Sequence, residues 1–492
     1  MRILPVLILL FCCQLPVIGQ NKRILSLEEA IRIASDSTIL SFRSKYEYQR
    51  KVWEYNLFKA NRRPQVELNF SPYYAKTLFS PEVDYIQITD NDYFLSRMEV
   101  EMRQKLLPLG GYFYASTRLA YQKFLSGTTP YVSTENLFGV TPLLVGYRHE
   151  LLGYNEFWWE ERLSSLQFEK AAKEFLYELQ QIIEQAVFYF FQVASAEAVW
   201  KMTEKNAASS DTIYQIGKER FAITSIKKEE LLTLELQKTN AQNSLHIARL
   251  NFDKARDALL SFLNLDRNEA IETVIPERYR PLFIELDDAV RKAKENNPYY
   301  LQLKEGELLA EQYLDKTTRE AGWQANLNVN IGVQQWGDDL GQAYWSPRRY
   351  TTGGIAVSLP LVDFGAAKSR KQIAQYLLEA TRLTGDESER VLREDISNSL
   401  REFNSQQFLL TEAEKAISLA DLSFEQVQQS YSMGQSDINT FTLSQSRKDE
   451  AYTNYITALQ SYWTSYYKLR RLTLFDYFNN VSLIYKLETL LK

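Results

Sequence analysis

The chain has 492 residues, a formal net charge of −5, and 57 lysine and arginine residues that are scattered rather than striped. Such a chain presents no basic surface for nucleic acid, so we expect no nucleic-acid partner. Its only histidines are His149 and His246, and its only cysteines are Cys12 and Cys13. With no paired carboxylates in a recognisable acid–base setting, this composition does not support an enzyme. We expect no catalytic residue, no cofactor and no metal site.

Residues 1–19 combine Arg2, an apolar run and Gly19, which is the pattern of a secretory signal peptide. Both cysteines lie inside this segment, so we expect an exported protein without disulfides. Bulky Phe11 precedes Cys12, where a lipoprotein signal needs a small residue, and we therefore assume no lipid anchor. After Gly19 no run of 18 apolar residues occurs, which argues against an ordinary bundle of membrane-spanning helices.

The chain repeats itself at two constant shifts. Residues 25–32 return about 259 positions later as residues 284–291. A second similarity, at a shift of about 210, pairs Phe221 with Tyr431. We infer an internal duplication, with residues 20–283 as the first repeat, 284–474 as the second and 475–492 as a C-terminal tail.

Four short segments alternate between apolar and polar residues. In residues 325–333, Ala, Leu, Val and Ile share one face while three asparagines and a glycine share the other, and residues 66–71 alternate in step. Residues 145–151 and 355–361 follow the same pattern, with His149 interrupting the apolar face. The alternation predicts strands with one apolar and one polar face. The polar face supplies five candidate lumen residues: Glu67, Asn69, Asn326, Asn328 and Asn330.

An antiparallel sheet packed on a soluble core would show the same alternation. Aromatic residues cluster at the segment ends, however, as in the girdles of outer-membrane barrels, and in an exported protein this favours strands that cross the outer membrane. A barrel in lipid must close, because an open edge leaves backbone groups without partners. Four strands cannot close alone, so we expect a barrel shared between copies, and three copies would give about 12 strands. The aromatic residues are Trp158, Trp159, Trp323, Trp336, Trp345, Tyr73, Tyr74, Tyr344 and Tyr350.

The repeat comparison leaves about 49 residues without a counterpart, between Tyr74 and Pro142. In this segment, about residues 75–140, alternating residues 98–102 and 113–119 flank a Pro/Gly-rich turn, which predicts a hairpin. The hairpin is either an extracellular flap or an enlargement of the barrel. We favour the flap, because the second half lacks the hairpin and the repeat geometry closes without it.

Residues 154–218 and 365–433 are nearly free of Gly and Pro and rich in good helix formers. They predict two helices of ~95 Å or more, at ~1.5 Å per residue. Each is followed by a short turn and a return helix, residues 226–264 and 437–472, with a 3-4 apolar spacing that indicates coiled-coil packing. Helices this long do not fit inside one globule, so we expect them to form an elongated tube.

At this point the chain resembles the TolC-like outer membrane efflux proteins, from about Leu25 to Leu472. The resemblance rests on residues 27–30 with their counterpart 286–289, the strand-to-helix signature at residues 359–365, and Tyr431-Ser432-Met433-Gly434 at a helical turn. It implies a mainly α fold with a membrane β-barrel: a homotrimer with a shared, roughly 12-stranded barrel in the outer membrane and a long α-helical barrel in the periplasm. It also implies an entrance that opens when a periplasmic adaptor (membrane fusion protein) and an inner-membrane pump of the RND or ABC type dock.

Two features depart from the family's pattern. The family's two aspartates after the Tyr-x-x-Gly turn, which ring the closed entrance with negative charge, match Thr440 and Leu443 here, and the nearest acid is Asp437. We therefore expect no acidic, cation-binding ring at the usual place. In the first half Thr224 stands where Gly434 would predict a glycine, so the two turns should differ in conformation.

We interpret the chain as a trimeric channel-tunnel, a passive exit duct for efflux or type I secretion that a pump drives through an adaptor. Both cargo classes fit the sequence. The alternative is a coiled-coil structural or adaptor protein of the cell envelope, but an adaptor would show one helical hairpin and a structural coiled coil would lack two-faced strands. Candidate entrance and adaptor-docking residues lie at the two helical turns: Arg220, Phe221, Lys227, Lys228 and Glu229 in the first, and Tyr431, Gly434, Ser436 and Asp437 in the second.

Overall fold

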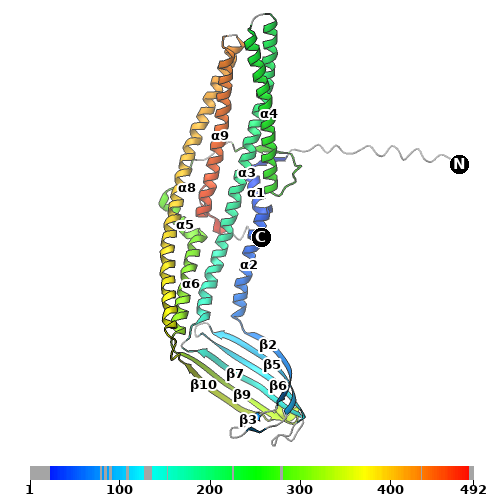
Figure 1. Cartoon of the computed structure of the whole chain (residues 1–492), viewed down its shortest axis with the longest axis vertical. Coiled ribbons are helices and arrows are strands. Elements are labelled where there is room, and N and C mark those ends of the chain that lie inside the picture. The colour runs from blue at the N-terminus through cyan, green and yellow to red at the C-terminus, as the bar shows by residue number, and fades with distance from the viewer. Residues whose placement is uncertain are drawn as a thin grey trace, which may run out of the picture. The chain divides into compact units, whose positions relative to one another are not determined.

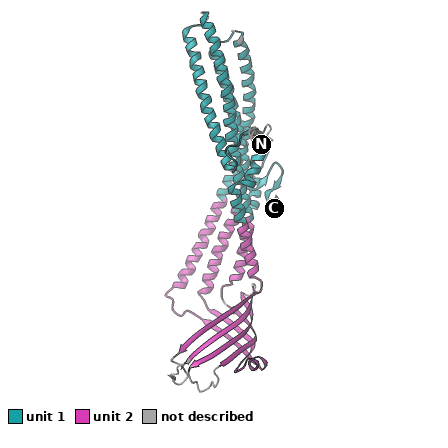
Figure 2. Ribbon diagram, turned by 90° about the vertical axis from the view of Figure 1, so that its right-hand side faces the viewer, with its two compact units in different colours: residues 1–48, 172–298, 390–492 teal, residues 49–171, 299–389 magenta. Residues whose placement is uncertain are grey.

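The chain is mainly helical, with a six-stranded sheet, and divides into two compact units (Figure 2). Unit 1 comprises residues 1–48, 172–298 and 390–492, and unit 2 comprises residues 49–171 and 299–389. The expectation of a mainly α-helical chain with strands is confirmed, while the expected signal peptide lies outside the described residues. The computed structural model describes residues 23–77, 80–81, 86–87, 91–106, 110–126, 136–151, 153–223, 226–276, 281–433 and 435–486.

Two long helices, α3 (Glu156–Ala222) and α8 (Ala366–Ser432), have 67 residues each, which corresponds to ~100 Å of helix. Each is followed by a return helix, α4 (Lys228–Phe262) or α9 (Ile438–Thr473), as the sequence predicts (Figure 1). The start of α8 is set by Asp363, whose carboxylate accepts hydrogen bonds from the backbone N–H of Gly365 at 2.9 Å and of Ala367 at 2.8 Å. The strand-to-helix signature therefore includes a helix cap.

Four shorter helices precede the strands of the two halves. They are α1 (Leu27–Ser37) and α2 (Ile39–Asn61) in the first half, and α5 (Leu286–Asn296) and α6 (Pro298–Glu320) in the second. Ser26 caps α1 by accepting a hydrogen bond from the backbone N–H of Glu29 at 3.2 Å, and Pro298 occupies the first position of α6, where no N–H is needed. The bounds of α5 and α6 follow those of α1 and α2 at the 259-residue shift, and those of α8 follow α3 at the 210-residue shift.

The six-stranded sheet belongs to unit 2, and its strand order is β10-β9-β7-β6-β5-β2 (Figure 1). Every neighbouring pair is antiparallel. Pro142 lies where the register between β7 and β9 shifts, and a proline is tolerated at such an irregularity because it has no N–H to donate. The strands are β2 (Gln65–Thr77), β5 (Asn91–Leu106), β6 (Gly111–Ser126), β7 (Asn136–Glu150), β9 (Gln324–Gly337) and β10 (Arg348–Ser358), and the short helix α7 (Leu340–Trp345) connects β9 to β10.

The additional hairpin of the first half is part of this sheet. Strands β5 and β6 lie between β2 and β7, and 13 residue pairs join β2 to β5 in continuous register. The preference for an extracellular flap was therefore wrong. The chain contributes six strands to the sheet, where four were expected. The sequence misled because alternation identifies a strand but does not identify its neighbour, and the second half closes its own pair, β9 and β10, without an insert.

Unit 1 contains the tips of the two helical hairpins, two small sheets and the C-terminal segment. Aromatic rings pack between the arms of each hairpin: the ring centres of Trp200 and Phe252 lie 5.1 Å apart, and those of Phe403 and Tyr462 lie 5.4 Å apart. Phe252 and Tyr462 belong to the predicted rows of 3-4 spacing on the return helices, which we call seams, and the residues of both seams are half-buried or buried. The seams are Leu245, Ala248, Phe252, Ala255, Leu259 and Phe262 in α4, and Tyr455, Ala458, Tyr462, Ser465, Leu469 and Leu472 in α9. The small sheets are parallel β1 (Arg23–Ser26) with β8 (Ile271–Val274), and antiparallel β11 (Phe475–Asp476) with β12 (Val481–Ser482); the short pair β3 (Ser80–Pro81) and β4 (Ile86–Gln87) belongs to unit 2.

The C-terminal segment packs against α5 and α9. The hydroxyl of Tyr466 donates to Asp476 at 3.0 Å, Arg470 pairs with Asp476 at 3.4 Å, and the ammonium of Lys292 lies 3.5 Å from the centre of the Phe475 ring. A 3-10 turn, η1 (Leu483–Lys486), follows β12. Burial raises the pKa of the Tyr477 phenol to about 12. The described part of the tail is thus a folded element of unit 1.

The seam of the second hairpin can be tested with Phe403, whose side chain is 0% exposed and contacts Tyr462 and Tyr466. We expect Phe403→Ala to lower the free energy of unfolding by about 3–5 kcal/mol, because it leaves a cavity among large rings. Thermal unfolding followed by circular dichroism would measure the loss, and Phe403→Leu should cost less. Equal unfolding temperatures for the native protein and Phe403→Ala would contradict this packing.

Candidate functional site

The register of the sheet places the five candidate lumen residues on one face. Gln65, Arg103, Tyr114, Gly146, Asn330 and Thr352 lie opposite one another in turn and form a row across all six strands. Opposed residues share a face, and so do residues two apart along a strand. Glu67 and Asn69 on β2 therefore share a face with Asn326, Asn328 and Asn330 on β9. That this polar face lines a lumen remains a prediction.

A tyrosine of the additional hairpin crosses β7 to reach the second half of the chain. The Tyr114 hydroxyl on β6 donates a hydrogen bond to the side-chain oxygen of Asn330 on β9. The path between them passes over Gly146 on β7, where an added Cβ would lie 2.2 Å from the tyrosine ring. Gly146 is needed for this close approach. Asn330 in turn donates to the Thr352 hydroxyl on β10 at 3.3 Å, so the polar contacts extend over four strands.

The hairpin also supplies most of the charged side chains of the polar face. Arg118 on β6 pairs with Glu99 on β5 at 2.9 Å, and Arg103 pairs with Glu101 along β5. In contrast, the polar face of β9 carries asparagines. These charged residues were absent from the sequence-based candidates because the hairpin had been assigned to a flap. The signal was present in the alternation of Met98-Glu99-Val100-Glu101-Met102, which matches β2 in polarity.

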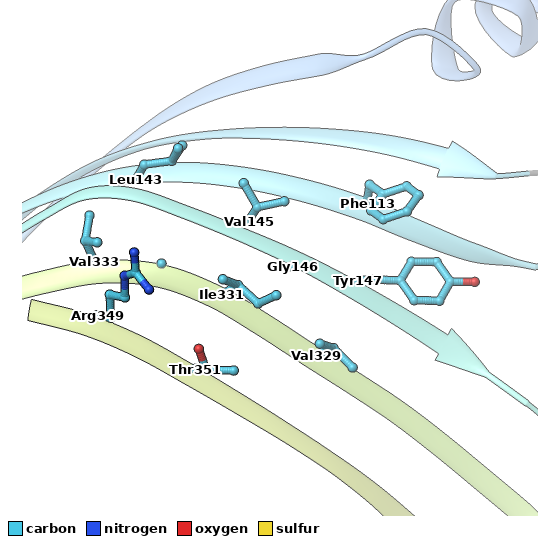
Figure 3. Close-up of a pocket in the computed structure, with 11 residues that line it drawn as sticks. Phe113, Leu143, Val145, Gly146, Tyr147, Val329, Ile331, Val333, Arg349 and Thr351 are labelled. Carbon is cyan, nitrogen blue, oxygen red and sulfur yellow. The ribbon is translucent and has the colours of Figure 1, made fainter.

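The opposite face of the sheet is apolar. Figure 3 shows its centre, where Phe113 of β6 lies beside Tyr147 of β7, with ring centres 4.8 Å apart, and side chains of β9 continue the face. A shallow groove of about 610 Å³ lies on this face, and Arg349 of β10 is the charged residue among those that line it. The apolar face comprises Val66, Leu68, Phe70, Met98, Val100, Met102, Phe113, Leu119, Val145, Tyr147, Val329, Ile331, Ile355 and Val357.

The predicted aromatic girdle is only partly supported. Trp345 of α7 is 81% exposed, and Tyr344, whose ring centre lies 5.6 Å from that of Trp345, is also exposed. Trp159, by contrast, is 5% exposed: its indole N–H donates to Asp315 at 3.0 Å and its ring packs with Leu163 of α3. Tyr350 lies opposite Gly332 on the polar face. Proximity to a strand end therefore does not by itself identify a girdle residue.

The two helical tips of unit 1 contain the remaining candidates. Arg220 and Phe221 lie at the exposed end of α3, Lys227 precedes α4, and Lys228 and Glu229 begin α4, all exposed. The Lys227 side chain makes no capping hydrogen bond. Lysines at the start of a helix are disfavoured by the helix dipole, whereas Glu229 is favoured there. The first tip is therefore strongly charged and weakly capped.

The second tip is capped and more tightly packed. The Asp437 carboxylate accepts a hydrogen bond from the backbone N–H of Thr440 at 2.7 Å, and this bond holds the pKa of Asp437 below its ordinary value. The Tyr431 ring packs on buried Phe441 with centres 5.1 Å apart, so Tyr431 is partly a packing residue. Ser436 is half-buried beside the cap. Gly434 and its counterpart Thr224 lie outside the described residues.

Both hairpins carry the same internal brace below their tips. In the first, Lys238 pairs with Asp211 at 2.6 Å and lies over the Tyr214 ring at 5.1 Å. In the second, Lys448 pairs with Asp421 at 2.8 Å and lies over the Phe424 ring at 4.9 Å. The three positions correspond at the 210-residue shift. The hairpins therefore share a brace and differ at their ends.

A polar cluster joins the two hairpins and was not anticipated from the sequence. The Asn206 side chain of α3 donates to the Asp449 carboxylate of α9 at 2.5 Å, and Gln445 donates to the Asn206 oxygen at 2.5 Å. Burial raises the pKa of Asp449, because it disfavours the charged form. No local motif marks this cluster, since Asn206 lies more than 230 positions before both Gln445 and Asp449 in the sequence.

Within the residue ranges that the structure describes, no group of three or more His, Cys, Asp or Glu side chains could hold a metal ion. Over the same ranges, no helix is both long and apolar enough to cross a membrane. His246 is exposed on α4, and His149 stacks on Tyr147 with ring centres 6.0 Å apart.

A two-faced antiparallel sheet joined to two long helical hairpins is the architecture of the TolC-like outer membrane channels, and this chain has that fold. The resemblance found in the sequence is thereby confirmed for the fold. No family model and no curated protein matches the chain.

Similar solved structures include a membrane protein from Pseudomonas aeruginosa, with a TM-score of 0.62, 10% identity, and coverage of 91% of this chain and 90% of that one. The CmeC outer membrane channel of Campylobacter jejuni has a TM-score of 0.60 and 12% identity, covering 94% and 89%. The open state of the MtrE outer membrane channel of Neisseria gonorrhoeae has a TM-score of 0.60 and 12% identity, covering 91% and 88%.

The polar cluster predicts a pH dependence of stability. The pKa of Asp449 is higher in the folded state than its ordinary value of 3.8, which applies to the unfolded chain. The free energy of unfolding therefore rises as the pH falls from above the folded pKa toward that ordinary value. Asp449→Asn removes this titration but still accepts a hydrogen bond from Asn206. We expect the variant to be at least as stable as the native protein at about pH 8 and to lose that advantage by about pH 4.

The measurement is the unfolding temperature of both proteins across this pH range. Glu450→Gln, at the exposed next position of α9, is the matched control and should follow the native curve. If the unfolding temperatures of the native protein and Asp449→Asn differ by the same amount at every pH, the pKa of Asp449 is not raised.

Proposed function

We propose that the chain is one subunit of a homotrimeric duct across the outer membrane and periplasm, a passive exit route for efflux or type I secretion. The observation that carries this proposal is the two-faced sheet of unit 2. Its apolar face suits hydrocarbon, and its polar face suits a water-filled lumen. Unlike an envelope adaptor or a structural coiled coil, a membrane duct needs both faces.

The sheet edges support assembly from several copies. Strands β2 and β10 are the ends of the strand order, and Leu68 and Ile355, on the apolar face at these two edges, are 65% and 60% exposed. Unpaired edges in lipid cost several kcal/mol per backbone group. Six strands, each antiparallel to the next, leave β2 and β10 running in opposite directions. The β10 edge of one copy can therefore pair antiparallel with the β2 edge of the next.

The long helical hairpins suit the periplasmic part of such a duct, and transport needs no chemistry from the chain. The candidate tip residues would meet a periplasmic adaptor and hold the entrance closed, and the adaptor would couple the duct to an inner-membrane RND or ABC pump. The CmeC, OprN and MtrE structures are described as outer membrane channels, which supports the channel function by analogy of fold. The tip residues in this role are a proposal.

Extraction and conductance test the duct. We expect the mature protein to require detergent for release from membranes, to migrate as an oligomer that dissociates on heating, and to produce ion current in planar bilayers. The physical reason is the exposed apolar face, which needs lipid or detergent. A monomer that is soluble without detergent and gives no current would exclude the proposal.

The gating role of the tips is a separate prediction. We expect Asp437→Ala to raise single-channel conductance, because loss of the cap loosens the turn before α9. Asp437→Asn can still cap the helix and is the matched control. Lys227→Gln together with Lys228→Gln tests the first tip. If all variants match the native protein in conductance and voltage response, the tips do not control the entrance.

A further inference from the structure

We propose that the additional hairpin widens the shared barrel from 12 to about 18 strands in the trimer and makes it a duct for bulky hydrated cargo. This inference rests on the proposed function. It concerns the size and the lining of the duct, and it starts from the position of β5 and β6 inside the sheet.

The first observation is that the hairpin is a full member of the sheet. Strands β5 and β6 have 16 residues each, as long as any other strand of the sheet. Each is paired on both sides, β5 with β2 and β6, and β6 with β5 and β7. A flap over a lumen would leave β2 paired with β7, as β9 pairs with β10 in the second half.

The second observation is that the two faces continue through the hairpin. Met98 and Val100 extend the apolar face from Phe70 and Leu68, and Glu99 extends the polar face from Asn69. A one-residue slip would turn every side chain to the wrong face. The hairpin therefore carries the same membrane-compatible pattern as its neighbours.

The third observation concerns closure. Adding two strands keeps an even number per copy, so the edges still run in opposite directions and can pair antiparallel between copies. Barrel diameter grows roughly in proportion to strand number, so an 18-stranded ring at equal tilt is about 1.5 times as wide as a 12-stranded one. Its cross-sectional area is then about 2.2 times as large.

The lining changes together with the width. The hairpin adds paired charges, Arg118 with Glu99 and Arg103 with Glu101, to a face that β9 lines with asparagines. Because these charges are paired within the wall, they keep it hydrated without giving it one dominant sign. Such a wall suits large, water-soluble permeants.

The experiment uses two cysteine pairs in the full-length protein, whose own cysteines, Cys12 and Cys13, lie in the expected signal peptide. Asn69→Cys with Glu99→Cys joins directly opposed positions on β2 and β5 and should form a disulfide. Asn69→Cys with Leu144→Cys is the matched control: with two strands between β2 and β7, the sites lie at least ~14 Å apart, beyond the reach of a disulfide.

Deletion of residues 78–126 removes the hairpin and leaves residues 127–135 to connect β2 to β7. If β2 and β7 then adopt the register of β9 and β10, in which Asn328 lies opposite Gly354, their counterparts Asn69 and Leu144 become opposed. We expect the 69–144 pair to crosslink only in the deletion variant. We also expect that variant to exclude smaller polyethylene glycols, added from the outer side, than the native channel does.

If the deletion variant fails to assemble, a direct count of the strands in the native barrel decides. Electron cryomicroscopy of the native trimer should show about 18 strands in the barrel. A conducting trimer with a 12-stranded barrel, or a 69–144 disulfide in the native protein, would overturn the inference while leaving the duct intact. If the native protein itself gives no current and forms no oligomer, the result instead counts against the proposed function.

Discussion

The structure of unit 2 depends on the backbone hydrogen-bond ladder of its sheet. Where the solvent cannot bond to the backbone, every strand needs a partner on each side, and the side chains must then divide cleanly between two faces. Six strands here keep that division in register, through the shift near Pro142. Gln65 and Thr352 lie at the two ends of one row because, at each step from strand to strand, the two opposed residues lie on the same face. The ladder therefore determines which side chains share each face, and it leaves β2 and β10 as the two edges of the sheet.

Local chemistry made much of the fold predictable from the sequence. The four main helices were expected within a few residues of their ends, because Gly and Pro are rare in them and good helix formers are frequent. The two faces of β2 and β9 followed from alternation alone. The position of the hairpin did not, because strand pairing joins distant residues and alternation is the same for every neighbour. The contact of Tyr114 with Asn330 over Gly146 is visible only once β6, β7 and β9 are adjacent.

The candidate sites were predictable to different degrees for the same reason. Asp437 was expected only as an entrance residue, and the structure adds that it caps α9 by accepting a hydrogen bond from the backbone N–H of Thr440. Tyr431, a candidate for adaptor docking, also packs on Phe441 of the returning helix, a contact set by how the hairpin closes. Asp449 had no local signal, since its hydrogen-bond partner Asn206 lies on another helix and far away along the chain. Residues whose roles depend on tertiary neighbours were the ones the sequence could not assign.

The two halves correspond over most of their length and differ at a few places. The long helices, the braces at Lys238 and Lys448, and the seam positions Phe252 and Tyr462 correspond at one shift. The halves diverge at the tips, where Lys227 stands in place of the cap Asp437, and in the sheet, where only the first half has β5 and β6. A single added strand would have made the two edges run in the same direction and prevented antiparallel closure. In the shared barrel proposed above, a hairpin is the smallest insertion that adds strands and still leaves the two edges able to pair antiparallel.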